Sequence, residues 1–350
     1  MVTSLVVTLE KAARIAMCSL VSNRPYHVQW LITRKCNYRC KGCNVWRDQD
    51  SKELSTEEIK KGLDILKELG VIDIVFSGGN PLLRNDISEI LEYASRFFVT
   101  TVYDNGSMAL KKIDALRNVD FVAISLDSLN PEKNDHVKGV KGSWNNAMQA
   151  IQGLHEEGIS VGISPTISQF NIHEMVDFTK YFTEKGIPLW YCLYSHDMPP
   201  DSDQLFKIGK MNDKFEIAEK EAMVKLCDVL IDMKKKNSNI LITTKTLEAL
   251  KRLYLDGKRL WKCRALQNFF MIDHLGRVAG CHLRSPAASI FDLPEVWNSD
   301  DFNALRKIYS ECDRCIYLCY IVYSLHGSVR GNLQIVKDQW KSAKLFFKKN

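Results

Sequence analysis

The sequence predicts an α/β protein whose main part is a partial (β/α)6 TIM-like barrel, followed by a small cysteine-bearing module and flanked by a helix at each end. Between residues 28 and 193, short apolar runs alternate with segments of helical period. Strands joined through helices pair in parallel with right-handed crossovers. Because six such strands are found where a closed barrel needs eight, we expect an open barrel.

The expected elements follow one another in a regular order. The strands lie at Val28–Thr33, Ile72–Phe76, Phe98–Tyr103, Phe121–Ser125, Ser160–Ile167 and Pro188–Leu193. The helices between them lie at Thr56–Leu69, Asp86–Arg96, Met108–Arg117, Ser143–Glu157 and His173–Lys185. Beyond the barrel we expect helices at Lys214–Asn237 and Leu247–Leu255, and a hairpin of Asn268–Asp273 with Arg277–Leu283.

The chain divides into five parts on this pattern. They are an N-terminal amphipathic helix at 1–24, the barrel at 25–200, a helical linker at 201–260, the cysteine module at 261–325 and a basic amphipathic helix at 326–350.

Composition points to a cytoplasmic protein. No apolar run reaches the ~20 residues that span a bilayer, and Glu10, Lys11 and Arg14 interrupt the N-terminal stretch, which argues against a signal peptide. The net charge of +6 is mild, so no nucleic-acid partner is expected. In a reducing compartment, the clustering among the eleven cysteines favours metal ligands over disulfides.

The first cysteine cluster follows the first expected strand directly. Cys36, Cys40 and Cys43 have the spacing CxxxCxxC, and three thiolates hold only three irons of a [4Fe–4S] cube, which leaves one iron open. The alternatives are a ferredoxin-like loop or a zinc knuckle, although a zinc site usually has paired CxxC elements and a fourth local ligand.

This segment resembles the cluster loop of radical S-adenosylmethionine (SAM) enzymes, although Gly42 stands where that family usually has an aromatic residue. The resemblance implies that the open iron chelates the amino and carboxylate groups of SAM. Reduction of the sulfonium then breaks the C5′–S bond, and the 5′-deoxyadenosyl radical abstracts hydrogen from a substrate. The cofactors supply this chemistry, and the protein positions and shields them.

Three further strand ends resemble SAM-binding elements of that family. Gly78, Gly79 and Asn80 match its GGEP motif, in which the glycines admit the SAM methionyl amine and Asn80 replaces the usual Glu. The resemblance places Asn80 at the SAM amino group, so Asn80→Glu is expected to preserve or tighten SAM binding. The alternative for this segment is a plain strand-to-helix turn.

The other two elements come later in the chain. Asn105 lies in a stretch similar to the family's TNG motif, beside the adenosine. Ser125 and Asp127 match its SxD element near the SAM carboxylate and ribose, and Lys138 stands where relatives often carry an Arg that pairs with that carboxylate. The sequence assigns no catalytic residue.

The C-terminal cysteines resemble the twitch and SPASM extensions of radical SAM enzymes. That resemblance implies an auxiliary [4Fe–4S] cluster on Cys263, Cys281, Cys312 and Cys315, with Cys319 as a fifth candidate ligand. A structural zinc site is the alternative, because four cysteines also satisfy zinc.

The two ends of the chain carry amphipathic stripes. Leu5, Leu9 and Ala12 share one helical face, and Trp340 and Phe347 belong to a second stripe flanked by lysines. Such helices either pack on the barrel or lie in a membrane surface. An amphipathic helix before the cluster strand also resembles radical SAM enzymes of hopanoid and archaeal lipid assembly.

These features together predict a radical SAM enzyme, with an electron donor such as ferredoxin or flavodoxin. The leading substrate hypothesis is C–C bond formation on a membrane lipid, at a peripheral membrane contact. One alternative is a maturase that modifies a ribosomal peptide, and the other is a non-catalytic Fe–S redox or scaffold protein.

Overall fold

The computed structural model describes residues 24–47, 52–195, 213–314 and 316–325. Its strands form an eight-stranded sheet in the order β10-β9-β8-β1-β2-β3-β4-β5 and a two-stranded sheet of β6 and β7. The strands are β1 His27–Thr33, β2 Asp73–Gly78, β3 Val99–Asp104, β4 Phe121–Ile124, β5 Val161–Ile163, β6 Thr166–Ile167, β7 Cys192–Leu193, β8 Phe269–Ile272, β9 Arg277–Ala279 and β10 Ala288–Ser289.

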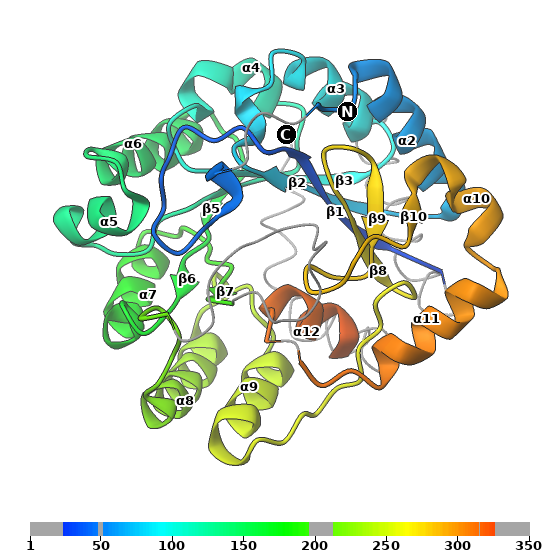
Figure 1. Cartoon of the computed structure of the whole chain (residues 1–350). Helices are drawn as coiled ribbons and strands as arrows, with labels where there is room; N and C mark the ends of the chain where they lie inside the picture. Colours follow the sequence, from blue (N-terminus) through cyan, green and yellow to red (C-terminus); the bar gives the residue numbers. More distant parts are fainter. Residues whose placement is uncertain (1–23, 48–51, 196–212, 315, 326–350) are drawn as a thin grey trace.

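Helices surround these strands in the order of the chain (Figure 1). They are α2 Thr56–Leu69, α3 Ile87–Ser95, α4 Ile113–Leu116, α5 Pro131–Lys138, α6 Ser143–Glu156, α7 Met175–Glu184, α8 Lys220–Lys236, α9 Thr244–Asp256, α10 Leu293–Val296, α11 Asp300–Ser310 and α12 Leu318–Leu325.

The expected partial barrel is confirmed. Strands β1 to β5 pair in parallel, and single bridges from Ile163 to Leu189 and from Leu189 to Ile240 continue the curve beyond β5. The helix expected at Thr56–Leu69 has those bounds, and Ser55 and Glu58 form its capping box.

The C-terminal hairpin extends the barrel sheet. Its strands β8 and β9 form where the sequence indicated, and β8 pairs in parallel with β1. The local pattern predicted the hairpin but not this long-range pairing, and it also missed α5 and α12. The helices expected at 1–24 and 326–350 lie outside the described residues. Within the part of the chain that is described, no helix is long and apolar enough to cross a membrane.

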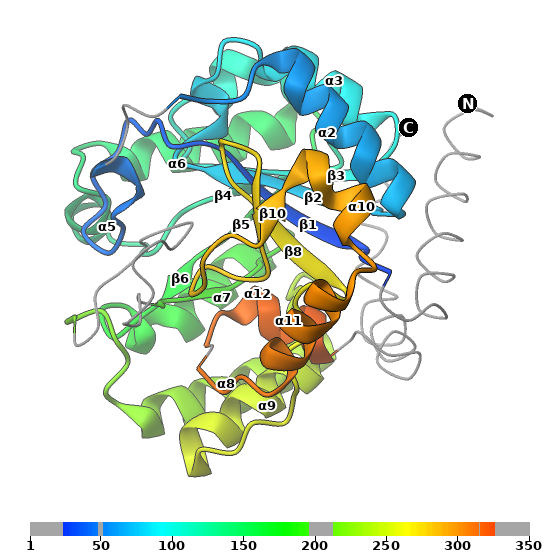
Figure 2. The same cartoon turned by 45° about the vertical axis from the view of Figure 1, so that its right-hand side comes forward.

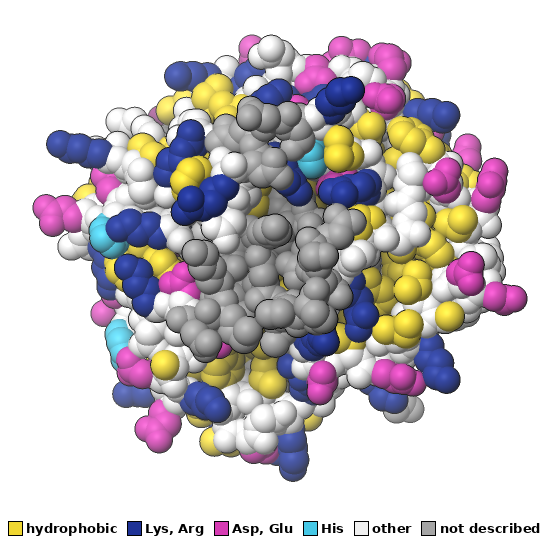
Figure 3. Space-filling model, viewed as in Figure 1, with side chains coloured by type: hydrophobic (Ala, Val, Ile, Leu, Met, Phe, Trp, Pro, Cys, Tyr) yellow, Lys and Arg dark blue, Asp and Glu magenta, His cyan; other side chains and the backbone are white. Residues whose placement is uncertain are grey.

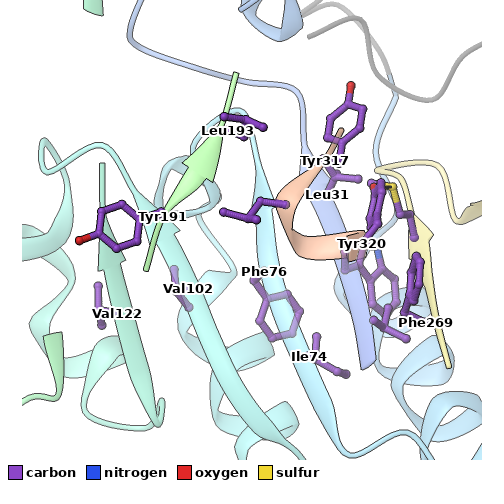
Figure 4. Close-up of a cluster of buried hydrophobic side chains, with 14 of the residues drawn as sticks. Leu31, Ile74, Phe76, Val102, Val122, Tyr191, Leu193, Phe269, Tyr317 and Tyr320 are labelled. Carbon is purple, nitrogen blue, oxygen red and sulfur yellow. Dashed lines mark hydrogen bonds between the residues drawn. The ribbon is translucent and has the colours of Figure 1, made fainter. Parts of the chain in front are cut away.

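Helix α12 lies on the inner face of the sheet, opposite α2 and α3 (Figure 2). Its Tyr320 ring stacks on Phe269 at 5.1 Å between centroids, and its Tyr323 ring stacks on His27 at 3.7 Å. Figure 4 shows Tyr317 and Tyr320 beside the inward-facing Leu31 and Phe269. The inner face of the sheet at β1 and β8 is therefore lined by an aromatic helix.

One glycine of α2, Gly62, allows this helix to pack closely on the outer face of the sheet. A β-carbon at Gly62 would lie 2.7 Å from the buried Trp30 ring, whereas one at Gly153 in α6 would meet only the end of the exposed Leu110 side chain, at 2.6 Å. The Trp30 ring is fully buried and has no room to yield, but the Leu110 side chain can rotate away.

We therefore expect the two Gly→Ala substitutions to have opposite signs. Replacing a helical glycine by alanine normally stabilises a protein by roughly 0.5–1 kcal/mol. Gly153→Ala should keep that gain and raise the midpoint of thermal unfolding, while Gly62→Ala should lower it by overpacking. Equal shifts for both variants, measured by circular dichroism, would contradict this packing.

Candidate functional site

The loop that carries Cys36, Cys40 and Cys43 follows β1 and lies against the loop after β2. The Gly79 N–H donates to the Thr33 carbonyl at 2.7 Å, and the Asn80 N–H donates to the Lys35 carbonyl at 2.7 Å. A β-carbon at Gly78 or Gly79 would clash with these same backbone oxygens. The two glycines thus have a structural task, because they let the loops after β1 and β2 approach each other.

A second contact fixes the other half of the cysteine loop. The Arg39 N–H donates to the carbonyl of Lys138 at 3.3 Å, and the Lys41 N–H donates to that of Val137 at 2.9 Å. Gly139 ends α5 with a φ of +65°, and a β-carbon there would clash with the Arg39 carbonyl. The end of α5, which sequence reasoning missed, therefore holds the cysteine loop from the side opposite β2.

The three thiols of this loop act on one another electrostatically. Burial raises the pKa of Cys40 to about 12 and that of Cys43 to about 11, and it also raises the pKa of Cys36. Neighbouring thiols add to the rise at Cys40 and Cys43, while the Lys138 ammonium lowers the pKa of all three. Among the described residues, no three His, Cys, Asp or Glu side chains already stand in metal-ligand geometry.

The donor set fits an iron–sulfur cluster. Thiolates are the soft ligands that such clusters require, and a nearby ammonium favours their deprotonated form. Because ligand thiols lose their protons when metal binds, the raised pKa values describe the metal-free loop.

Ser125, Asp127 and Lys138 meet in one buried cluster. The Lys138 Nζ lies 2.7 Å from the Asp127 Oδ2 and donates to the Ser125 Oγ at 2.6 Å, and the Lys138 and Asp127 side chains are only 6% and 8% exposed. Burial alone would lower the pKa of Lys138, but the Asp127 carboxylate, together with Cys40 and Tyr38, outweighs burial and raises this pKa. The structure thus joins three sequence-predicted residues into an ion pair with a hydroxyl.

Asn80 lies in a buried position next to a carboxylate. Its Oδ1 accepts the Leu82 N–H at 3.0 Å, and its Nδ2 is buried without a hydrogen-bond partner of ordinary geometry. Burial raises the pKa of Asp104 at the end of β3, and the Asn80 amide and the Gly106 N–H counteract that rise. The Oδ1 of Asp104 also has no partner. A Glu at position 80 would bring a second carboxylate to this buried place.

Asn105 connects the β3 end with the cysteine loop. Its Nδ2 donates to the Asn37 Oδ1 at 2.9 Å, and the Asn37 Nδ2 donates to the Ser107 Oγ at 2.7 Å. Sequence reasoning missed Asn37, which lies inside the CxxxCxxC segment and carries no signal beyond that position. All seven barrel residues expected at the SAM site therefore lie at strand ends or at the end of α5, around the cysteine loop.

The C-terminal cysteines separate into two groups. Burial raises the pKa of Cys263 to about 11 and that of Cys281 to about 12, and the nearby Cys312 thiol adds to both rises. Cys319 instead forms a hydrogen bond with Cys192 of β7. Cys315 lies outside the described residues. The structure thus sets Cys319 apart from the other described candidate ligands of the auxiliary cluster.

Basic residues are frequent around the first cysteine cluster. The loop itself contributes Arg34, Lys35, Arg39 and Lys41. Figure 3 shows Lys and Arg side chains spread around the described part of the face on which this loop lies. A surface of this kind favours anionic molecules at the site.

Comparison with known proteins relates the barrel part of the chain to one family. The model of the radical SAM superfamily matches residues 30–182. Fe-coproporphyrin III synthase of Methanosarcina barkeri is 34% identical over 174 residues, which cover 48% of this chain and 43% of that protein. The AdoMet-dependent heme synthase of the same organism is 24% identical over 323 residues, which cover 85% of this chain and 90% of that protein.

The fold agrees with a solved structure. Streptococcus suis SuiB bound to S-adenosylmethionine superposes with a TM-score of 0.66 at 17% identity, over 82% of this chain and 69% of SuiB, which shows a shared fold. The chain spans less than half the length of several synthases that match its barrel. Residues 30–182 therefore form a radical SAM domain.

Proposed function

We propose that this chain binds a [4Fe–4S] cluster through Cys36, Cys40 and Cys43 and cleaves SAM reductively, so that a 5′-deoxyadenosyl radical abstracts hydrogen from a substrate. The observation that carries the proposal is the group of three thiols on one loop at the end of β1, beside the buried Lys138. The bound cofactors supply the radical chemistry, and the residues of the chain position and shield them.

The chain's own residues have separate tasks in this proposal. Lys138 stabilises the thiolate forms of the ligands, and Asp127 keeps the Lys138 ammonium charged and in place. Gly78 and Gly79 hold the cysteine loop against β2. Asn80 and Asn105 form the wall of the SAM site next to that loop.

The auxiliary [4Fe–4S] cluster is part of the proposal. Cys263, Cys281 and Cys312 supply three thiols that lie close enough to influence one another, and Cys315 is the proposed fourth ligand. Cys319 is left out, because its partner is Cys192. The reaction also needs a one-electron reductant, for which a ferredoxin or flavodoxin is the proposed donor.

Three substrate classes have support of different kinds. A membrane lipid is favoured by the terminal amphipathic stripes of the sequence. An iron tetrapyrrole is favoured by the heme synthase, whose match covers 85% of this chain. A peptide is suggested by SuiB, which is also solved bound to its precursor peptide SuiA. The basic cysteine loop fits the first two best, because phospholipids and porphyrin carboxylates are both anionic.

One experiment separates these classes. Reconstituted protein is given SAM and dithionite under anaerobic conditions, with anionic phospholipid vesicles, iron coproporphyrin III or a mixed peptide library as the probe. The class that contains the substrate should raise the rate of 5′-deoxyadenosine formation above the rate with SAM alone. A rise with the tetrapyrrole alone would rule out the lipid hypothesis, and a rise with vesicles alone would support it.

The two ligand sets predict how iron is distributed. The wild-type protein should hold about eight irons, as two [4Fe–4S] clusters. Replacing Cys36, Cys40 and Cys43 by Ala should remove about half of this iron and all SAM cleavage, and Cys281→Ala should remove the other half. Cys227→Ala is the matched control, since Cys227 is fully buried in α8 and belongs to neither set.

Iron analysis and chromatography of 5′-deoxyadenosine measure both quantities. SAM cleavage by the triple variant would refute the assignment of the cluster. Zinc in place of the iron that depends on Cys281 would turn the auxiliary site into a structural one. Retention of both clusters without SAM cleavage in the wild type would favour a redox scaffold.

The environment of Asn80 revises the expectation for Asn80→Glu. A carboxylate at position 80 would lie near the buried Asp104, so the single variant should lose on the order of 1–3 kcal/mol of stability, the usual penalty for an uncompensated buried group. It should also bind SAM more weakly. The double variant Asn80→Glu, Asp104→Asn carries only one carboxylate and should recover both properties.

Thermal unfolding of the metal-free protein measures the stability, and equilibrium dialysis of the reconstituted protein measures SAM binding. If Asn80→Glu were as stable as the wild type and bound SAM more tightly, position 80 would face the SAM amino group without interference from Asp104.

A further inference from the structure

Helix α12 brings a cysteine to the inner face of the barrel. Cys319 and Tyr323 are four residues apart and therefore share one face of α12. Tyr323 stacks on His27 at the start of β1. Cys319 lies close enough to Tyr103, near the end of β3, to raise the pKa of its hydroxyl. Helix α12 thus runs along the inner face, with Cys319 closer than Tyr323 to the strand ends that carry the site.

A second cysteine meets it there. Cys192 opens β7, and its Sγ lies 3.4 Å from the Ser164 Oγ. Helix α12 packs against β7, and the Cys319 thiol forms a hydrogen bond with Cys192 there. Both cysteines are half-buried. Residues far apart in the sequence therefore form a close thiol pair that neither secondary structure nor spacing foretold.

The thiol pair shares its surroundings with the proposed SAM site. The Asp127 carboxylate raises the pKa of Cys192 and of Cys40 in the cluster loop, and the Lys138 ammonium lowers the pKa of both. The thiols that raise the pKa of Cys281 are instead Cys263 and Cys312. The pair thus lies on the side of the barrel that carries the proposed SAM site.

We propose that Cys192 and Cys319 are a redox thiol pair that gives a hydrogen atom to a carbon-centred radical formed in the barrel. This inference rests on the proposed function, which supplies the radical. An S–H bond is weaker than an ordinary C–H bond, so a carbon radical takes hydrogen from a thiol readily. A second thiol at hydrogen-bond distance then stabilises the sulfur radical that remains.

One S–H bond of the pair breaks, a C–H bond forms on the substrate, and a thiyl radical is left. The other sulfur gives its proton to water and, as a thiolate, adds to the thiyl radical to give a disulfide radical anion. That anion passes one electron to a one-electron acceptor, for which the oxidised iron–sulfur cluster is suited, and a disulfide remains. A dithiol reductant then returns two electrons and two protons to regenerate both thiols.

The first test asks whether the two sulfurs form a disulfide, independently of SAM chemistry. Reconstituted protein is treated with diamide without oxygen, alkylated, digested and analysed by mass spectrometry. We expect a linked peptide that joins Cys192 to Cys319 and that disappears after reduction. Quantitative alkylation of both cysteines after diamide treatment would overturn the proposal.

The second test follows the hydrogen atom. The protein is exchanged into D2O and given SAM and dithionite with no added substrate, so that the 5′-deoxyadenosyl radical itself is the carbon radical. The 5′-deoxyadenosine should carry one deuterium from the thiol pair. The deuterated fraction of the product should fall to background in Cys192→Ala and in Cys319→Ala, and Cys227→Ala should match the wild type.

The outcomes of this test distinguish the two proposals. If the wild type makes no 5′-deoxyadenosine, the proposed function fails, while the disulfide result still stands on its own. If 5′-deoxyadenosine forms but contains no deuterium, or if its deuterated fraction is the same in Cys192→Ala, the role of the thiol pair is refuted and the proposed function is unaffected.

Discussion

The buried ion pair of Lys138 and Asp127 is the interaction on which the arrangement of the site depends. Its two side chains come from the end of α5 and from the segment after β4, and both are nearly inaccessible to water. A buried pair is stable only while both partners are present, since removal of one leaves an uncompensated charge. The backbone of Lys138 also binds the cysteine loop through Arg39, so the same residue positions the loop and supplies charge to its thiols.

Close backbone contacts explain why the neighbouring positions are glycines. Gly78 and Gly79 allow the loops after β1 and β2 to bind each other, and Gly139 does the same between α5 and Arg39. The cysteine loop is thus fixed on two sides, which limits the entropy lost when a cluster binds. Its high thiol pKa values in the metal-free state mean that assembly of a cluster releases protons.

Local patterns predicted much of this architecture, and long-range packing decided the rest. The alternation of strands and helices predicted the partial barrel. The resemblance assigned Ser125, Asp127 and Lys138 to one site, but their contact with one another was not predicted. The pairing of β8 with β1 joins residues more than 200 positions apart and leaves no periodic signal. The contact of Asn80 with Asp104 likewise depends on how two strand ends are placed side by side.

The cysteines show the same limit. Spacing alone grouped Cys319 with Cys312 and Cys315, because they are close in the sequence. In the fold, α12 turns Cys319 toward the barrel interior and toward Cys192, which is far from it in the sequence. Closeness in the sequence therefore did not indicate which cysteines lie together in the fold.

In the proposed function, SAM binds directly to an iron held by Cys36, Cys40 and Cys43. Electron paramagnetic resonance of the reduced, reconstituted protein tests it most directly, with Cys281→Ala used to remove the signal of the auxiliary cluster. We predict that adding SAM shifts the g values of the remaining [4Fe–4S] signal, because SAM binding changes the ligands of one iron. A spectrum that is identical with and without saturating SAM would contradict it.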